Sequence, residues 1–190
     1  NLIVVQGEQM AYGDHVDARP VDDLDELGIL GAVRSLQEGV DMASSGDDIL
    51  IEPGTFQEQL VIAKELTLAG SGAGVVLQAP PVLTEYFTTG GPNYPILYAH
   101  DADVSISDMT IDGLHRGNGN YRFTGIGYWN CGGSISSVEV TGVRDDPFSG
   151  SQHGIGIYAF NNTGGPYSLD LTDVTITDFQ KAGIVLGGGG

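Results

Sequence analysis

Basic residues are scarce in this chain of 190 residues, in which seven Lys and Arg face 25 Asp and Glu, for a formal net charge of −18. A surface of this sign repels the phosphates of nucleic acids and the headgroups of anionic lipids. We therefore expect no nucleic-acid partner. The dominance of Asp over Lys is also common in proteins from saline habitats, which is a statement about habitat and not about activity.

Cysteine and long apolar runs are equally scarce. Cys131 is the single cysteine, so no disulfide can form within the chain. No apolar stretch reaches the roughly 20 residues that a membrane-spanning helix needs. The four histidines show no spacing typical of a metal site. We expect a single domain that does not span a membrane, and the sequence identifies no cofactor apart from the candidate Ca²⁺ site described below.

Glycine, in contrast, is abundant, with 30 residues, and it marks a repeat. A phrase of the form Gly-Ile-Gly or Gly-Ile-Val occurs three times, with its isoleucine at positions 126, 155 and 184, so that both intervals are 29 residues. A fixed period of this size is typical of a solenoid, in which each repeat buries its apolar face against its neighbours. Apolar and small residues alternate within each phrase, which indicates strands.

A second repeated segment supports this interpretation. Residues 104–113 match residues 134–142 and again residues 169–178. Each repeat thus holds three short strands joined by loops of variable length. We predict an all-β fold, a right-handed parallel β-helix with three sheets, over residues 29–190.

The first part of the chain has two other patterns. Apolar residues at steps of three and four, from Ile29 through Leu36 to Ala43, place one apolar stripe along a helix. We expect this amphipathic helix, residues 29–46, to cap the first coil. Residues 1–28 are expected to form an acidic arm with one strand at residues 2–5.

Residues 33–77 resemble a known family, through the segments Ile-Glu-Pro-Gly-Thr-Phe-Gln-Glu (51–58) and Leu-Thr-Leu-Ala-Gly (66–70). They look like the opening coils of right-handed β-helix proteins of the pectin-lyase-like superfamily. That opening is shared by pectin methylesterases, polysaccharide lyases and many secreted proteins of unassigned role. The resemblance implies the fold and an extracellular or cell-surface location, but it does not single out an activity.

The printed sequence ends in four glycines directly after an expected strand. An uncapped strand edge invites pairing with another strand. We expect either further C-terminal coils or an end-to-end contact with another subunit.

Aromatic side chains are expected on the outer face of the sheet that carries the glycine phrase. If Ile126, Ile155 and Ile184 point inward, alternation turns Trp129 and Tyr158 outward. The same register holds His100 one repeat earlier. Such a ladder suits stacking of sugar rings, and we assign these three residues, with Arg116 and Arg122 in the adjacent loop, to carbohydrate binding. The alternative is a ladder that stacks only on itself and stiffens the sheet.

The next loop could carry chemistry instead. Arg144, Asp145, Asp146 and His153 are the catalytic candidates if the chain is an enzyme. Paired carboxylates can serve as acid and base in glycoside cleavage, or Asp145 and Asp146 could bind Ca²⁺, and Arg could abstract a proton in a lyase. Complete motifs of polygalacturonases and pectin methylesterases are absent, and local pairing within the loop is the structural alternative.

Two functions from different classes follow. The first is an extracellular, non-catalytic module that binds carbohydrate or builds a surface assembly. The second is a polysaccharide lyase or glycoside hydrolase that acts on an acidic glycan.

Overall fold

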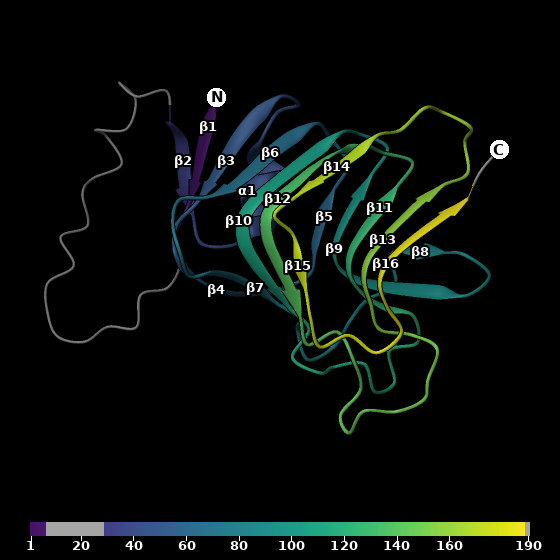
Figure 1. Ribbon diagram of the computed structural model, residues 1–190. Helices are drawn as coiled ribbons and strands as arrows, with labels where there is room; N and C mark the ends of the chain where they lie inside the picture. Colours follow the sequence, from purple (N-terminus) through teal and green to yellow (C-terminus); the bar gives the residue numbers. More distant parts are fainter. Residues whose placement is uncertain (7–28, 189–190) are drawn as a thin grey trace, which may run out of the picture.

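The computed structural model describes residues 1–6 and 29–188. Most of the expected acidic arm, residues 7–28, lies outside the described residues. The regular structure is almost entirely parallel β-strand, arranged in two sheets that face each other across the core (Figure 1). The expected strand at residues 2–5 is confirmed as β1.

The larger sheet, called sheet A here, has ten strands. Its main path runs in the order β14-β12-β10-β6-β3-β1-β2, with β15 paired to β12 and β7 paired to both β4 and β10. The strands are β1 (Leu2–Val5), β2 (Ile29–Val33), β3 (Asp47–Ile51), β4 (Gly54–Gln57), β6 (Leu66–Gly70), β7 (Val75–Gln78), β10 (Val104–Asp112), β12 (Gly133–Thr141), β14 (Leu169–Thr172) and β15 (Thr175–Ile176).

The smaller sheet, sheet B, has six strands in the order β16-β13-β11-β9-β5, with β8 paired antiparallel to β9. These are β5 (Leu60–Ile62), β8 (Phe87–Thr88), β9 (Pro92–His100), β11 (Phe123–Trp129), β13 (Ile155–Asn161) and β16 (Ala182–Gly188). From β9 onward the chain alternates between the two sheets. Each strand pairs in parallel with the strand one turn earlier.

The core lies between the sheets and is formed by aliphatic side chains such as Ile106 and Ile135 from sheet A and Ile126 and Ile157 from sheet B. The pairing of sheet A follows the expected repeat. Ile106 is the partner of Ile135, and Ile135 is the partner of Leu171. The longer connection at residues 162–168, compared with residues 130–132 one turn earlier, leaves this register unchanged.

The expected three-sheet, right-handed parallel β-helix is wrong. The described strands form two parallel sheets and no closed solenoid. The reason lies in β10 and β12, each nine residues long, which bend in the middle at Asp108 (φ 57°) and Ser137 (φ 53°). Pairing continues on both sides of the bend, with β6 before it and β7 after it. Two segments expected in separate sheets therefore belong to one.

The expected helix is also shorter than predicted. The helix α1 spans only Leu36–Met42, and Ile29–Val33 forms β2, which pairs with β1. The helix begins at Leu36 because the Glu58 carboxylate accepts hydrogen bonds from the backbone N–H groups of Leu36 (2.9 Å) and Gln37 (3.1 Å). These are donors that a helix cannot satisfy internally. Lys64 donates to the carbonyls of Val40 and Ala43 at the other end.

In sheet B the expected register of 29 residues holds between β9 and β11, but β13 is displaced by two residues relative to β11 and β16. Ile126 pairs with Ile157, and Ile157 pairs with Ile184, whereas Ile155 pairs with Thr124. Gly125 faces the core, because a Cβ there would lie 2.6 Å from a methyl carbon of Val140. Two consecutive residues, Gly125 and Ile126, thus point inward and interrupt the simple alternation.

Strands β14 and β16 are outer strands of their sheets in the described part of the chain, and Leu186 on β16 is 78% exposed. The expectation that further coils or a second subunit cover these edges stays a prediction. The seven-residue α1 is far too short to cross a membrane, and no other helix in residues 1–6 and 29–188 could do so.

Candidate functional site

The outer face of sheet B carries a cluster of aromatic side chains, called the aromatic face here. It is formed by Tyr86, Phe87, Tyr98, His100, Trp129, Tyr158 and Phe160. Strands β9, β11 and β13 present five of these rings at successive levels of the sheet, and Tyr86 and Phe87 come from β8 and the residue before it. The aromatic cluster expected on this face is therefore present, although its members and their order differ from the expected ladder.

The expected ladder of His100, Trp129 and Tyr158 is only partly correct. His100 is the partner of Trp129, but Trp129 pairs with Phe160. The indole of Trp129 stacks on the Phe160 ring with 4.8 Å between centroids and 23° between planes. Tyr158 is in register with Gly127 and Tyr98 instead. Phe160 was missed because the two-residue shift in sheet B cannot be read from a constant period.

Phe87 fills the centre of the aromatic face. A Cβ at Gly127 would lie only 3.3 Å from a ring carbon of Phe87, so the absence of a side chain at Gly127 makes room for this ring. Phe87 lies 5.0 Å from the ring of Tyr98 and 5.1 Å from that of Trp129. As a result Tyr98 is only 6% exposed and Tyr158 9% exposed. Burial raises the pKa of the Tyr98 hydroxyl.

One part of the aromatic face stays accessible. His100, Trp129 and Phe160 are each half-buried, and they form a continuous row, called the open row here. His100 Nδ1 lies 2.9 Å from an oxygen of Asp101, which fixes the orientation of the imidazole. The face thus combines a covered half under Phe87 with an open half along this row.

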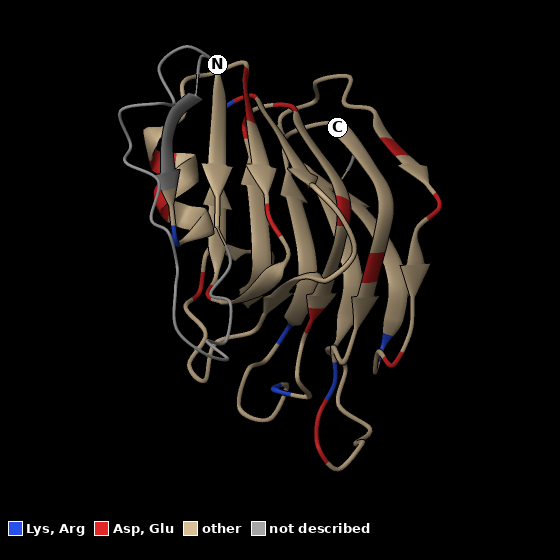
Figure 2. Ribbon diagram, turned by 90° about the vertical axis from the view of Figure 1, so that its left-hand side faces the viewer, with Lys and Arg blue, Asp and Glu red and all other residues tan. Residues whose placement is uncertain are grey.

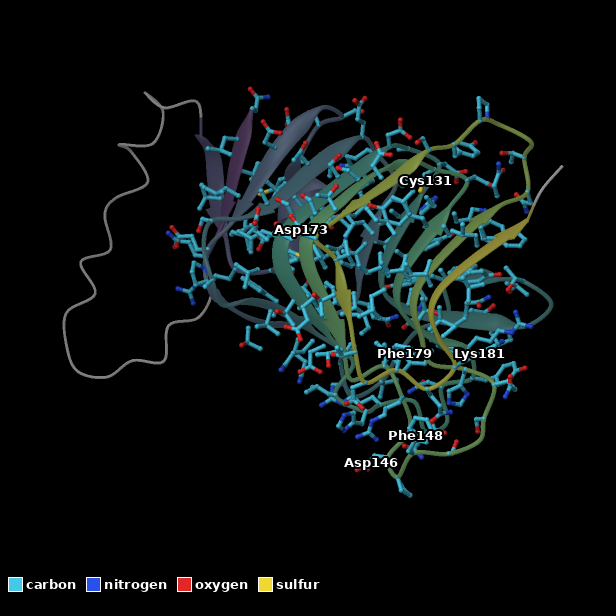
Figure 3. The ribbon with its side chains drawn as sticks, in the orientation of Figure 1. Cys131, Asp146, Phe148, Asp173, Phe179 and Lys181 are labelled. Atoms are coloured by element: carbon cyan, nitrogen blue, oxygen red, sulfur yellow. The ribbon has the colours of Figure 1, made fainter. Side chains whose placement is uncertain are left out.

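A cavity of about 150 Å³ lies on the same face, at the end where the chain enters sheet B from sheet A. It is lined by Asn93, Tyr121, Arg122, Gln152, Ile155, Tyr158, Lys181 and Val185. Arg122 Nη1 donates to the carbonyl and the hydroxyl of Thr89, which holds the guanidinium against the turn between β8 and β9. Lys181 is exposed and directly precedes β16 (Figure 3).

The connections from sheet A to sheet B carry four of the seven basic residues, namely Arg116, Arg122, Arg144 and Lys181. Figure 2 shows basic residues concentrated in the loops at one end of the sheets, in a molecule that is otherwise acidic. Arg116 donates through Nη1 to the carbonyl of Ala79, just after β7. Of the two arginines predicted to bind carbohydrate, Arg122 therefore lines the cavity on the aromatic face, whereas Arg116 is not among the residues that line it.

A buried network joins two of the predicted catalytic residues. His153 Nε2 lies 2.6 Å from Asp145 Oδ1, and both side chains are buried. The other carboxylate oxygen accepts hydrogen bonds from the Ser149 hydroxyl and from Gln180 Nε2. Although burial disfavours the charged form, the hydrogen bonds from Ser149, His153 and Gln180 hold the pKa of Asp145 below its usual range.

The other two predicted catalytic residues do not contact the Asp145 carboxylate, although Arg144 Nη1 donates to the backbone carbonyl of Asp145 (2.7 Å). Arg144 forms an ion pair with Asp178, which also contacts His115. Burial opposes ionisation of Asp178, but His115 and Arg144 lower the pKa of its carboxyl group. Asp146 projects from the tip of the loop with a 72% exposed side chain (Figure 3). Sequence reasoning missed Asp178 and Gln180, since both reach this loop from more than 30 positions away.

The residues proposed for Ca²⁺ do not fit that ion. Calcium takes six to eight oxygen ligands, and no group of three or more potential ligands is found among the described residues. Both Asp145 oxygens are already hydrogen-bonded, and Asp146 points to solvent.

The outer surface of sheet A has a different character. A groove of about 540 Å³ lies between residues 70–75 and the bends of β10 and β12, and a second hollow of about 370 Å³ adjoins it. Exposed acids line the two hollows at three successive levels of the sheet, at Asp108 in β10, Glu139 in β12 and Asp173 between β14 and β15. We call this the acidic groove. No Lys or Arg lines either hollow.

Comparisons of this chain with protein-family models, with curated proteins and with solved structures each found no match. The resemblance of residues 33–77 to the pectin-lyase-like superfamily therefore stays a prediction.

Proposed function

We propose that this chain is a non-catalytic carbohydrate-binding module and that the aromatic face of sheet B holds the glycan. The observation that carries the proposal is the open row, in which the Trp129 and Phe160 rings stack at 4.8 Å and remain partly exposed. The C–H faces of sugar rings pack against flat aromatic surfaces, which present a large apolar area with a defined geometry.

The rigidity of the row supports the same proposal. Trp129 is paired on both sides through the backbone of β9 and β13, and Phe87 packs against its ring at 5.1 Å. A side chain that is already ordered loses little conformational entropy when a ligand binds. The open row is therefore organised for stacking before any sugar arrives.

We also propose that the module acts outside the cell or at its surface. The support is the resemblance of residues 33–77 to the pectin-lyase-like superfamily, which contains many secreted proteins. The alternative non-catalytic function is assembly at a surface without a glycan. This alternative would be supported if the protein bound no polysaccharide.

The test is Trp129→Ala, assayed by affinity electrophoresis in gels that contain a panel of neutral and anionic polysaccharides. We expect about a tenfold loss of affinity, which corresponds to about 1.4 kcal/mol. Phe148→Ala is the matched control, because Phe148 is 62% exposed at the tip of a loop away from the aromatic face (Figure 3). Equal retention of both variants, with intact circular dichroism, would remove the open row as the binding surface.

A polysaccharide lyase or glycoside hydrolase is the second candidate. The observation in its favour is the 2.6 Å contact between Asp145 and His153, with Arg144 adjacent in the chain. Incubation with anionic and neutral polysaccharides would reveal unsaturated products by ultraviolet absorbance, or new reducing ends. Product formation that is lost in folded Asp145→Asn would establish this candidate, and no product from any polysaccharide would reject it.

A further inference from the structure

We propose that the cavity lined by Arg122 and Lys181 binds an anionic substituent of the glycan, a carboxylate or a sulfate ester. The inference rests on the proposed glycan binding and specifies which kind of glycan the aromatic face accepts. The cavity and the open row lie on the same face of sheet B, and they are linked by Tyr158, which lines the cavity and contacts Phe160.

The charge of the lining is the first argument. The chain has 25 acidic and only seven basic residues, yet the eight residues that line the cavity include two basic side chains and no carboxylate. Neither Arg122 nor Lys181 has a carboxylate within 4.0 Å among the described residues. Two cations that converge on one cavity without an acidic partner form a site for an anion.

The neighbouring acids are already engaged, which is the second argument. Asp145 is hydrogen-bonded by His153, Ser149 and Gln180. Asp178 is paired with Arg144 and His115. Neither carboxylate lines the cavity, and both already have partners of their own, so neither pairs with the two cations of the cavity.

The geometry of Arg122 is the third argument. Its Nη1 is used to hold the turn between β8 and β9 through Thr89. No hydrogen bond from Nη2 is recorded within the described residues, and Nε is buried without a partner, so Nη1 alone is engaged. Arg122 is therefore fixed in place by one nitrogen and presents another.

The size of the cavity limits the ligand. About 150 Å³ is close to the volume of five water molecules, at about 30 Å³ each. This space accepts a charged substituent with part of its sugar ring, while the rest of a polysaccharide remains outside. Tyr121 and Tyr158 contribute ring surface and Gln152 and Asn93 contribute amides to the wall, a combination that suits a sugar better than a bare inorganic ion.

The decisive variant is Lys181→Gln, because the Lys181 side chain is exposed and makes no recorded hydrogen bond or ion pair within the described residues, whereas the backbone N–H, which donates to Gly154, is untouched by the substitution. Arg34→Gln is the matched control, since it removes the same charge from an exposed position outside the cavity. The probes are a polyuronate with its neutral methyl ester, and a sulfated polysaccharide with its desulfated form. Affinity electrophoresis at about 0.15 M salt gives the dissociation constants.

We expect Lys181→Gln to weaken binding of the anionic forms about fivefold to tenfold and to leave the neutral forms unchanged, with Arg34→Gln like the unaltered chain. If Lys181→Gln weakens binding of the polyuronate, the bound anion is a carboxylate. If it weakens binding of the sulfated polysaccharide, the bound anion is a sulfate ester. Equal affinities of the two variants for both anionic probes would overturn the proposal, while neutral glycans that still need Trp129 would leave glycan binding in place. If no polysaccharide is retained at all, both proposals fall together.

Discussion

The outer surfaces of the two sheets are built by the same alternation of side chains, and yet they have opposite chemistry. The aromatic face of sheet B is apolar and has a cavity with two cations, whereas the acidic groove of sheet A is lined by Asp108, Glu139 and Asp173. In both sheets the inward residues are fixed by the core they fill. The outward residues are free of that requirement, so the two surfaces can specialise independently.

The largest expected effect comes from removing the ring that closes half of the aromatic face. Phe87→Ala deletes a side chain that is 8% exposed and contacts three other rings. We expect a loss of about 3 kcal/mol in the free energy of unfolding, measured by urea denaturation. Phe148→Ala should change it by less than about 0.5 kcal/mol, and equal losses in the two variants would show that Phe87 is not packed as described.

The buried network beside the cavity should respond to acid. The pKa of Asp145 is lower in the folded chain than its usual value near 3.9. The carboxylate therefore adds stability above about pH 4, and this contribution is lost as the pH falls through the folded-state pKa. We expect Asp145→Asn to cost about 1–3 kcal/mol at pH 7.

The difference in unfolding free energy between Asp145→Asn and the unaltered chain should shrink as the pH falls from 5 to 2. Asp146→Asn is the control for this prediction, because the Asp146 side chain is 72% exposed. A gap that stays constant over this range would contradict the role given to Asp145.

The smallest effect should come from the other surface. Glu139 is exposed in the acidic groove and lies between Thr110 and Thr175 in the ladder of sheet A. We expect Glu139→Gln to change the unfolding free energy by less than about 0.5 kcal/mol and to leave glycan affinity unaltered in the gel assay. A loss of glycan affinity as large as that of Trp129→Ala would contradict the assignment of glycan binding to the aromatic face and not to the acidic groove.

The sequence predicts the pairing of sheet A well and that of sheet B less well, for a local reason. Alternation is unbroken on each side of the bend in β10 and β12, so Ile106 and Ile135 align as expected. In sheet B, Gly125 turns inward beside Ile126, and Trp129 pairs with Phe160 instead of Tyr158. A constant spacing of isoleucines cannot reveal a residue that changes sides.

Other differences between the expected and the observed structure arise from contacts between residues that are distant in the sequence. Strands β10 and β12 pair in the same register before and after the bends at Asp108 and Ser137, which merges two expected sheets. The pairing of Ile29–Val33 with β1 replaces half of an apparently helical pattern. The network around Asp145 depends on Gln180, 35 residues away, so sequence proximity brought out the Asp145–His153 pair but could not supply its remaining partners.

The connection at residues 162–168 is longer than its counterpart one turn earlier, and β14 still meets β12 in the expected register. The pairing of β14 with β12 therefore does not depend on the length of the connection that precedes β14. A short epitope or a fluorescent-label sequence inserted there should be displayed without disturbing the sheets, which makes this position a practical handle for anchoring the protein to a surface or following it by microscopy.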